Sequence, residues 1–267
     1  VRYARYAGTA YLADEAAELV SKAERLRGLK RLGLEDSGVT ARGASLLVQS
    51  TELRALEVLE LSRNRLGDEG AAAVASAPER TRVVELVLQH NRIGPAGARA
   101  LAGAPNLALR SLDLANNQLL ADGVSALAQS SQLRLERLLL RGNRMGVVGA
   151  RAIAESAQLT ALTHLDLSDN KLGDAGATVL AEAKLSDLEE LTLDYNGIGE
   201  AGALDLARAA GPKLGRLSLR DNDVSDGGAT ALAQKPLTLL ILESNKVGAA
   251  TVAAFAHRGD VFLGEQR

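Results

Sequence analysis

The 267-residue chain contains no cysteine and no tryptophan, and its two Phe and four Tyr bring the aromatic content to only 2%. Without cysteine, the chain can form neither disulfides nor thiolate metal sites. A globular domain of this length usually fills a thick core with aromatic side chains. The scarcity of aromatics therefore predicts a thin, repetitive core of Leu, Val, Ile and Ala.

Charge of one sign and long hydrophobic runs are missing as well. The chain has 31 basic and 33 acidic residues, a net charge of −2, whereas a nucleic-acid-binding domain would be clearly basic. No segment approaches the roughly 18 uncharged apolar residues of a membrane helix, and the start lacks the charged-then-apolar pattern of a signal peptide. We therefore expect no nucleic-acid partner and no membrane partner.

What the chain has instead is an internal repeat. The segment "LTHLDLSDNKL" at residues 162–172 follows the pattern L-x-x-L-x-L-x-x-N-x-L, which recurs along the chain. The asparagine of the pattern occurs at steps of 27, 26, 26, 27, 26, 26 and 23 residues, a regularity that chance does not produce. Its positions are Asn64, Asn91, Asn117, Asn143, Asn170, Asn196, Asn222 and Asn245. A weaker first copy starts at Leu29, with Ser37 in place of the asparagine.

Each repeat predicts a short strand, a turn and a helix. The alternating L-x-L places two leucines on one face of a strand and the x residue on the other. A buried asparagine in the turn can hydrogen-bond loop backbone that would otherwise lack partners. Helices are expected over segments such as residues 71–77 and 177–183, beside a recurrent glycine that lets the helix start pack closely against its neighbour. Acids such as Asp68 and Asp174 at or near the helix starts are favoured by the helix dipole.

These residues resemble the leucine-rich repeats of the ribonuclease-inhibitor type, which are related to the repeats of Ran GTPase-activating proteins and NOD-like receptors. The resemblance implies an α/β horseshoe-shaped solenoid of about nine repeats, with parallel β-strands on the concave face and α-helices on the convex face. The solenoid is expected over residues 29–256.

The two ends depart from the repeat, as the ends of a solenoid must. Residues 1–28 are interpreted as an N-terminal helical cap or the remnant of an upstream repeat, with a helix over residues 12–25 and no strand before it. Residues 257–267 are interpreted as a C-terminal cap, in which "DVFLGEQR" adds a short last strand. Five of the six aromatic residues lie in the end segments and are expected to pack in these caps: Tyr3, Tyr6, Tyr11, Phe255 and Phe262.

Catalytic motifs are not found in the sequence. The histidines His90 and His164 lie three repeats apart, about 14 Å at strand spacing, so they cannot share a metal ion. No G-x-S-x-G and no phosphate-binding glycine loop occurs in a suitable context. We therefore predict that the chain is not an enzyme and needs no metal or cofactor.

The x residues of neighbouring repeats gather charge around the single tyrosine outside the end segments. Acidic residues fall on two adjacent repeats, arginines flank them on both sides, and Tyr and Arg are enriched at interface hot spots. Tyr195 and Asp194 are expected to be exposed there. The predicted partner-binding residues are Tyr195, Asp194, Glu190, Asp166, Asp169, Arg137, Arg141, Arg216 and Arg220. The alternative is a surface whose neighbouring repeats pair Arg with Asp or Glu across the sheet and so neutralise themselves.

A second row, directly after each asparagine, is basic in the first half of the chain. It contains Arg65, Arg92, Arg144 and Lys171. The row indicates either an anion-binding edge or the Lys and Arg that commonly occupy loop edges in such repeats.

Three functional hypotheses remain. The first is a non-catalytic scaffold that binds a protein partner on the concave face. The second is a GTPase-activating protein resembling the Ran regulators, although their long acidic tail is missing. The third is the sensor or effector portion of a larger protein, suggested by a start at Val1 instead of Met. Extracellular relatives usually carry cysteine-rich caps, so we expect a cytoplasmic protein that is a monomer or part of a larger chain or complex.

Overall fold

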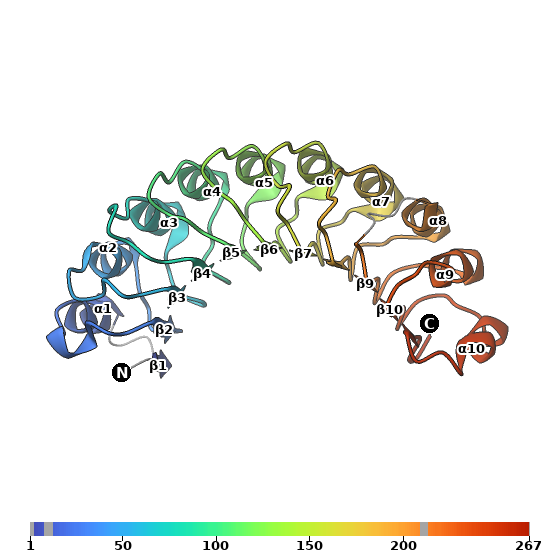
Figure 1. Cartoon of the computed structure of the whole chain (residues 1–267), viewed down its shortest axis with the longest axis horizontal. Helices are drawn as coiled ribbons and strands as arrows, with labels where there is room; N and C mark the ends of the chain where they lie inside the picture. Colours follow the sequence, from blue (N-terminus) through green and yellow to red (C-terminus); the bar gives the residue numbers. More distant parts are fainter. Residues whose placement is uncertain (1–2, 8–12, 209–212, 267) are drawn as a thin grey trace. The chain divides into compact units, whose positions relative to one another are not determined.

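The computed structural model describes residues 3–7, 13–208 and 213–266. The chain forms two compact units, Val1–Leu138 (unit 1) and Leu139–Arg267 (unit 2). In each unit, short strands alternate with helices along the chain (Figure 1). Tyr11 and Leu12 lie outside the described residues.

Unit 1 is built from parallel strands that pair in chain order. Its strands are β1 (Tyr3–Ala7), β2 (Arg31–Glu35), β3 (Val58–Glu60), β4 (Glu85–Val87) and β5 (Ser111–Asp113). Its helices are α1 (Ala13–Ser21), the 3-10 turn η1 (Glu24–Leu26), α2 (Ala41–Gln49), α3 (Gly67–Ala75), α4 (Pro95–Ala102) and α5 (Leu120–Ala128). The strand β6 (Arg137–Leu139) ends one residue into unit 2.

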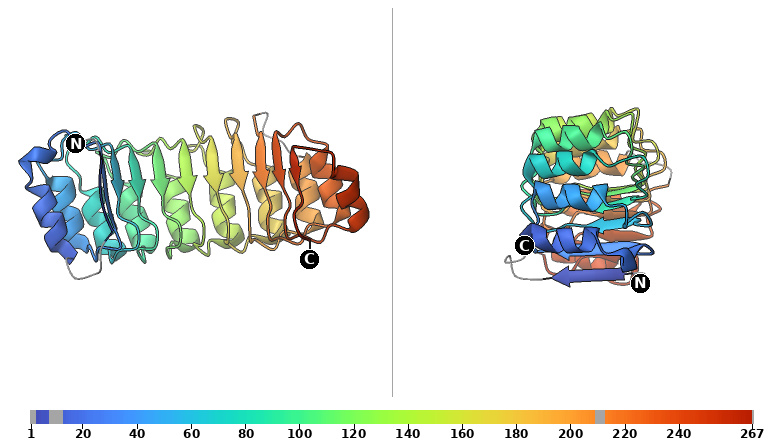
Figure 2. Two further views of the ribbon diagram at one scale, coloured as in Figure 1. Left: turned by 90° about the horizontal axis from the view of Figure 1, so that it is seen from below. Right: turned by 90° about the vertical axis from the view of Figure 1, so that its left-hand side faces the viewer.

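Unit 2 repeats the same plan. Its strands are β7 (His164–Asp166), β8 (Glu190–Thr192), β9 (Arg216–Ser218), β10 (Leu239–Ile241) and β11 (Val261–Phe262). Its helices are α6 (Gly146–Ala154), α7 (Gly173–Ala181), α8 (Glu200–Arg208), α9 (Asp226–Ala233) and α10 (Ala249–Phe255). In both units the strands lie side by side on one face and the helices cover the other (Figure 2). The α/β solenoid predicted from the repeat is confirmed.

The core of each unit lies between its sheet and its helices. Because the strands pair without offset, the middle leucines form rows: Leu165, Leu191 and Leu217 of unit 2 align from strand to strand and are at most 5% exposed. The x residues on either side of each leucine lie on the opposite face of the sheet. We call this face, away from the helices, the inner strand surface.

The buried asparagines form the predicted ladder. Asn222 shows the pattern: its Oδ1 accepts hydrogen bonds from the amides of Asn196 and Ile198 in the preceding repeat, at 3.0 Å each. Its Nδ2 donates to three carbonyl oxygens, those of Leu193, Leu219 and Arg220. One side chain therefore ties two successive loops together.

The helices begin earlier than expected. α3 and α7 start at Gly67 and Gly173, four residues before the predicted starts, because each helix follows the turn directly. Asp68 and Asp174 lie in the first turns of their helices as predicted, and their carboxylates also cap the helix that follows. The carboxylate of Asp68 accepts from the amides of Gly94 and Gly97, at the start of the following helix. The acids therefore cap the helix of the next repeat, and they connect neighbouring repeats on the helical side.

The two ends also differ from expectation. β1 precedes α1 and pairs with β2, so a strand stands where the sequence predicted none. At the other end, the predicted last strand is present as β11. Phe262, expected in the cap, is 50% exposed, whereas Val261 and Leu263 are buried. The reason is alternation: Val261 and Leu263 point to the core, so Phe262 between them must point away from it.

Candidate protein-interaction surface

The residue before each ladder asparagine adopts a left-handed backbone conformation. In unit 2 these residues include Asp169 (φ 52), Tyr195 (φ 57), Asp221 (φ 54) and Ser244 (φ 57). Asp and Asn tolerate this region better than a bulky tyrosine. The conformation recurs in repeat after repeat, so it belongs to the turn of the repeat and is not a strain specific to Tyr195.

Tyr195 is exposed but held in place from two sides. Its side chain is 47% exposed, and the guanidinium carbon of Arg141 lies 5.9 Å from the ring centroid, within the range of a cation–π contact. On the other side, a hydrogen bond with the Asp221 carboxylate raises the pKa of the Tyr195 hydroxyl above its usual value of 10.0. The ring is thus positioned before any partner arrives.

Asp194 connects two repeats and is half-buried, not fully exposed as expected. One of its oxygens accepts from the Ser218 hydroxyl at 2.5 Å and from the Arg220 amide at 2.9 Å. Burial raises the pKa of the Asp194 carboxyl, and the nearby negative charge of Asp166 acts in the same direction. The side chain therefore has a structural role that the sequence pattern did not show.

The other two aspartates differ from each other. Asp166 is half-buried and accepts from both the amide (2.8 Å) and the hydroxyl (2.6 Å) of Ser168. Asp169 is exposed in its left-handed turn position. Of the three predicted aspartates, Asp169 is therefore the most accessible to a partner.

Pairing across neighbouring strands accounts for part of the charge. Arg216 Nε lies 3.4 Å from Glu190 Oε2, and Arg220 Nε lies 3.5 Å from Glu243 Oε2. These arginines support the self-neutralising alternative, since each has an acidic neighbour one repeat away. Arg141 differs because it contacts the face of Tyr195. Arg137 is exposed and lies in unit 1, whereas the other eight predicted residues lie in unit 2.

A shallow hollow of about 200 Å³ opens on the inner strand surface of unit 2. Its polar lining includes Glu190, Asp194 and Arg216, and its apolar lining includes Leu239 and Ile241. In the pairing of β10 with β11, Ile241 lies beside the exposed Phe262, which extends the apolar side. The hollow therefore has an acidic side and an apolar side.

Several residues of this surface were not predicted from the sequence to belong to it. They are Asp221, Glu243, Leu239, Ile241 and Phe262. All five occupy inner or turn positions of their repeats. A systematic comparison of these positions through to the last strand would have found them.

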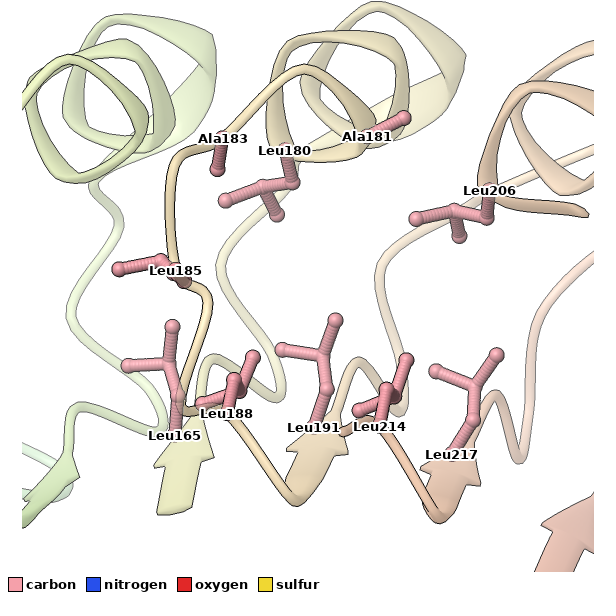
Figure 3. Close-up of a pocket in the computed structure, with 10 residues that line it drawn as sticks. All are labelled: Leu165, Leu180, Ala181, Ala183, Leu185, Leu188, Leu191, Leu206, Leu214 and Leu217. Atoms are coloured by element: carbon pink, nitrogen blue, oxygen red, sulfur yellow. The ribbon is translucent and has the colours of Figure 1, made fainter. Parts of the chain in front are cut away.

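A second cavity lies between the sheet and the helices of unit 2. It has about 40 Å³ and is lined by leucines and alanines, such as Leu191, Leu206 and Ala183, that point toward one another between strands β7–β9 and helices α7 and α8 (Figure 3). None of its lining residues carries a polar side chain. No group of three or more His, Asp or Glu side chains suited to a metal ion occurs within residues 3–7, 13–208 and 213–266. Over the same part of the chain, no helix is long and apolar enough to cross a membrane.

A family model described as "Leucine Rich repeat" matches five segments of the chain, residues 53–75, 83–102, 106–128, 158–181 and 212–233. The five segments are thus similar to leucine-rich repeats, and together they cover less than half of the chain. Each match runs into the helix of its repeat, from α3 at residues 53–75 to α9 at residues 212–233. None of the curated proteins matches the chain significantly.

Several solved structures are similar to the chain at low sequence identity. An internalin (InlF) from Listeria monocytogenes is 20% identical with a TM-score of 0.53, over 91% of this chain and 76% of the internalin. A chain of the PEPR1–AtPEP1 structure is 18% identical with a TM-score of 0.49, over 92% of this chain. A chain of the yeast Rad7–Elc1 complex is 14% identical with a TM-score of 0.47, over 98% of this chain and 80% of that one. This chain spans only 36% of the chain matched in the PEPR1–AtPEP1 structure.

Proposed function

We propose that the chain is a non-catalytic interaction module whose inner strand surface in unit 2 binds a protein partner. The observation that carries the proposal is Tyr195, an exposed aromatic ring positioned between Arg141 and Asp221. A preorganised aromatic side chain loses little conformational entropy on binding, and Tyr and Arg dominate interface hot spots.

The charges of this surface indicate the chemistry of the partner. Six carboxylates accompany three guanidinium groups, so negative charge is in excess. The carboxylates are those of Asp166, Asp169, Glu190, Asp194, Asp221 and Glu243, and the guanidinium groups are those of Arg141, Arg216 and Arg220. Beside them, Leu239, Ile241 and Phe262 supply apolar contact area. We expect a partner segment with basic side chains and at least one apolar anchor.

The subtype assignment belongs to the same proposal. Repeats of 26–27 residues, each carrying an α-helix of eight or nine residues, support the ribonuclease-inhibitor type and its relatives among Ran regulators and NOD-like receptors. We propose a cytoplasmic protein that acts as a monomer or as part of a larger chain or complex. The GTPase-activating alternative stays a prediction: adding the chain to its cognate GTPase would then accelerate GTP hydrolysis.

The test uses a variant that keeps the turn intact. Tyr195→Asn removes the ring but tolerates the left-handed backbone, whereas truncating Asp194 to Ala would remove two hydrogen bonds. Arg63→Asn is the matched control, because Arg63 is exposed and occupies the equivalent turn position of unit 1 with φ 56. Each protein is used to capture partners from the source lysate, and the dissociation constant of any captured protein is then measured.

Binding to Tyr195→Asn at least tenfold weaker than to wild type and to Arg63→Asn supports the proposal. An affinity that also falls with rising salt supports the acidic character of the surface. Equal affinity for all three proteins contradicts the proposed site.

A further inference from the structure

A second surface feature lies in unit 1, where loops carry the chain from the helices to the next strands. There a hollow of about 450 Å³ is lined by Arg27, Arg54, Ala55, Glu79, Arg80, Thr81 and Arg82. Four of its seven lining residues are arginines and one is acidic. Binding pockets for small molecules typically measure about 300–1,000 Å³, so the hollow has room for a small ligand.

The four arginines are not equally free. Arg27 is already paired, with its Nε 2.5 Å from Glu52 Oε2. Arg54 Nε donates to the Thr51 carbonyl at 2.6 Å, and Arg80 Nη2 donates to the Gln49 carbonyl at 2.7 Å. Carbonyl oxygens orient these guanidinium groups but do not neutralise them.

Arg82 completes the set. It is exposed, and within residues 3–7, 13–208 and 213–266 its side chain makes no hydrogen bond or ion pair. Arg54, Arg80 and Arg82 bring three positive charges to a lining whose one carboxylate is that of Glu79. Glu52, which pairs with Arg27, also acts on the charge of Arg54. The hollow keeps an excess of positive charge although the whole chain is slightly acidic.

We propose that this hollow binds a small ligand carrying more than one phosphate group. Guanidinium groups are planar forks that donate two parallel hydrogen bonds to phosphate oxygens. Two of the three forks are already oriented by backbone carbonyls, which lowers the entropy lost on binding. The Thr81 side chain supplies a hydroxyl donor in the same lining.

The region beneath the hollow limits what else can enter. An apolar recess continues inward from Arg54, Arg80 and Arg82 to Leu47 and Val83, but it has only about 20 Å³. That is room for about one water molecule, not for an acyl chain. The recognised chemistry is therefore the phosphate cluster itself, supplied either by a free phosphorylated compound or by a lipid headgroup.

The first experiment measures binding of inorganic tripolyphosphate to the full chain by calorimetry. Three proteins are compared: wild type, Arg54→Gln/Arg80→Gln/Arg82→Gln, and the matched control Arg65→Gln/Arg92→Gln/Arg99→Gln. The control removes the same charge from exposed arginines of unit 1 outside the hollow. Because Arg65 and Arg92 belong to the basic row after the asparagines, this control also tests whether that row binds anions. A single Arg82→Glu variant is included because Arg82 holds no structural contact, so it should fold even if the triple variant does not.

We expect wild type and control to bind alike, the triple variant to bind at least tenfold more weakly, and Arg82→Glu to follow the triple variant. Vesicles with and without phosphatidylinositol 4,5-bisphosphate then distinguish the two sources. If wild type binds the vesicles that contain this lipid and Arg82→Glu does not, the ligand is a lipid headgroup. If wild type binds tripolyphosphate but not these vesicles, the ligand is a free compound. No binding of tripolyphosphate to wild type overturns the proposal. The proposal is also overturned if the control triple variant binds tripolyphosphate as weakly as the Arg54→Gln/Arg80→Gln/Arg82→Gln variant, or if Arg82→Glu binds it as tightly as wild type.

Discussion

At the scale of the residue, the ladder asparagines each make several hydrogen bonds to the backbone. Asn196, for example, accepts from the amides of Asn170 and Leu172. It also donates to three carbonyl oxygens, those of Leu167, Leu193 and Asp194, so it satisfies backbone groups of two successive loops. An unpaired buried polar group costs about 1–3 kcal/mol. Repetition of this residue is therefore a requirement of the turn.

Asn222→Ala is expected to lower the free energy of unfolding by about 3 kcal/mol or more, because it leaves two amides and three carbonyls without their partner. Urea unfolding followed by circular dichroism measures the change. The control is Asn106→Ala, which removes a single hydrogen bond to the Ala77 carbonyl and should cost about 1 kcal/mol. Similar losses in the two variants would contradict the ladder's special role.

Asp194 provides a pH-dependent prediction. Because burial raises its folded-state pKa above the ordinary 3.8, the native state holds the proton more tightly than the unfolded chain between these two values. Stability contributed by this group therefore falls as pH rises through that window. Asp194→Asn keeps an acceptor oxygen but carries no charge. We expect its stability relative to wild type to be greatest at pH 7 and to decline as the pH is lowered toward 3.8.

Urea unfolding of both proteins at several pH values between 4 and 7 checks the Asp194 prediction. A stability difference that is constant over this range, or that grows on acidification, would show that burial does not penalise the ionised carboxylate.

At the scale of the element, neighbouring helices are joined by an acid and a glycine together. The Asp174 carboxylate accepts from the amides of Gly199 and Gly202 at the start of α8. A Cβ on Gly202 would lie 2.8 Å from Asp174 Oδ1 and 2.9 Å from the Ala177 Cβ. The absence of a side chain lets α8 approach α7 closely enough for this cap.

Gly202→Ala is therefore expected to destabilise the protein by about 1–3 kcal/mol, although alanine is the better helix former. Gly259→Ala is the control, because a Cβ there meets nothing within 4 Å. Denaturant titration of both variants measures the effect. A Gly202→Ala protein as stable as wild type would mean that the helices can separate without cost.

At the scale of the whole molecule, each repeat must cover the open edge of its neighbour. In unit 2, β11 and the residues after it cover the edge of β10 in the way that a further repeat would. Carbonyl oxygens of this segment accept hydrogen bonds from amides of β10 and the loop after it; for example, Leu242 N donates to Phe262 O at 2.7 Å. The Gln266 side chain accepts from the amides of Asn245 and Val247, so it takes the position of the next ladder asparagine.

Deletion of residues 257–267 is expected to lower the melting temperature by about 5–10 °C and to promote self-association, because it exposes the β10 edge and the core leucines beneath it. Thermal melts and sedimentation velocity measure the two effects. Phe262→Ala in the full chain is the control, since this side chain is half exposed and should change stability little. A truncated protein that stays monomeric with an unchanged melting temperature would contradict this account.

The repeat itself was determined by the sequence. The leucine spacing and the asparagine steps are local patterns with a fixed structural meaning, so they predicted the strands, the ladder, the helices and the α/β solenoid. The repeat pattern also placed Tyr195 and Asp169 on an exposed surface, and both are exposed in the turn that precedes the ladder asparagine.

Only the tertiary structure decided which residues become interaction partners. The cap of Asp68 on the following helix, the burial of Asp194 and the contacts of Tyr195 with Arg141 and Asp221 all join residues 24 to 54 positions apart. The hollow lined by Arg54, Arg80 and Arg82 likewise depends on the meeting of two loops, one between α2 and β3 and one between α3 and β4. Sequence spacing fixes the direction of a side chain within its own repeat. Its partner depends on the packing of one repeat against the next, which is a property of three-dimensional distance.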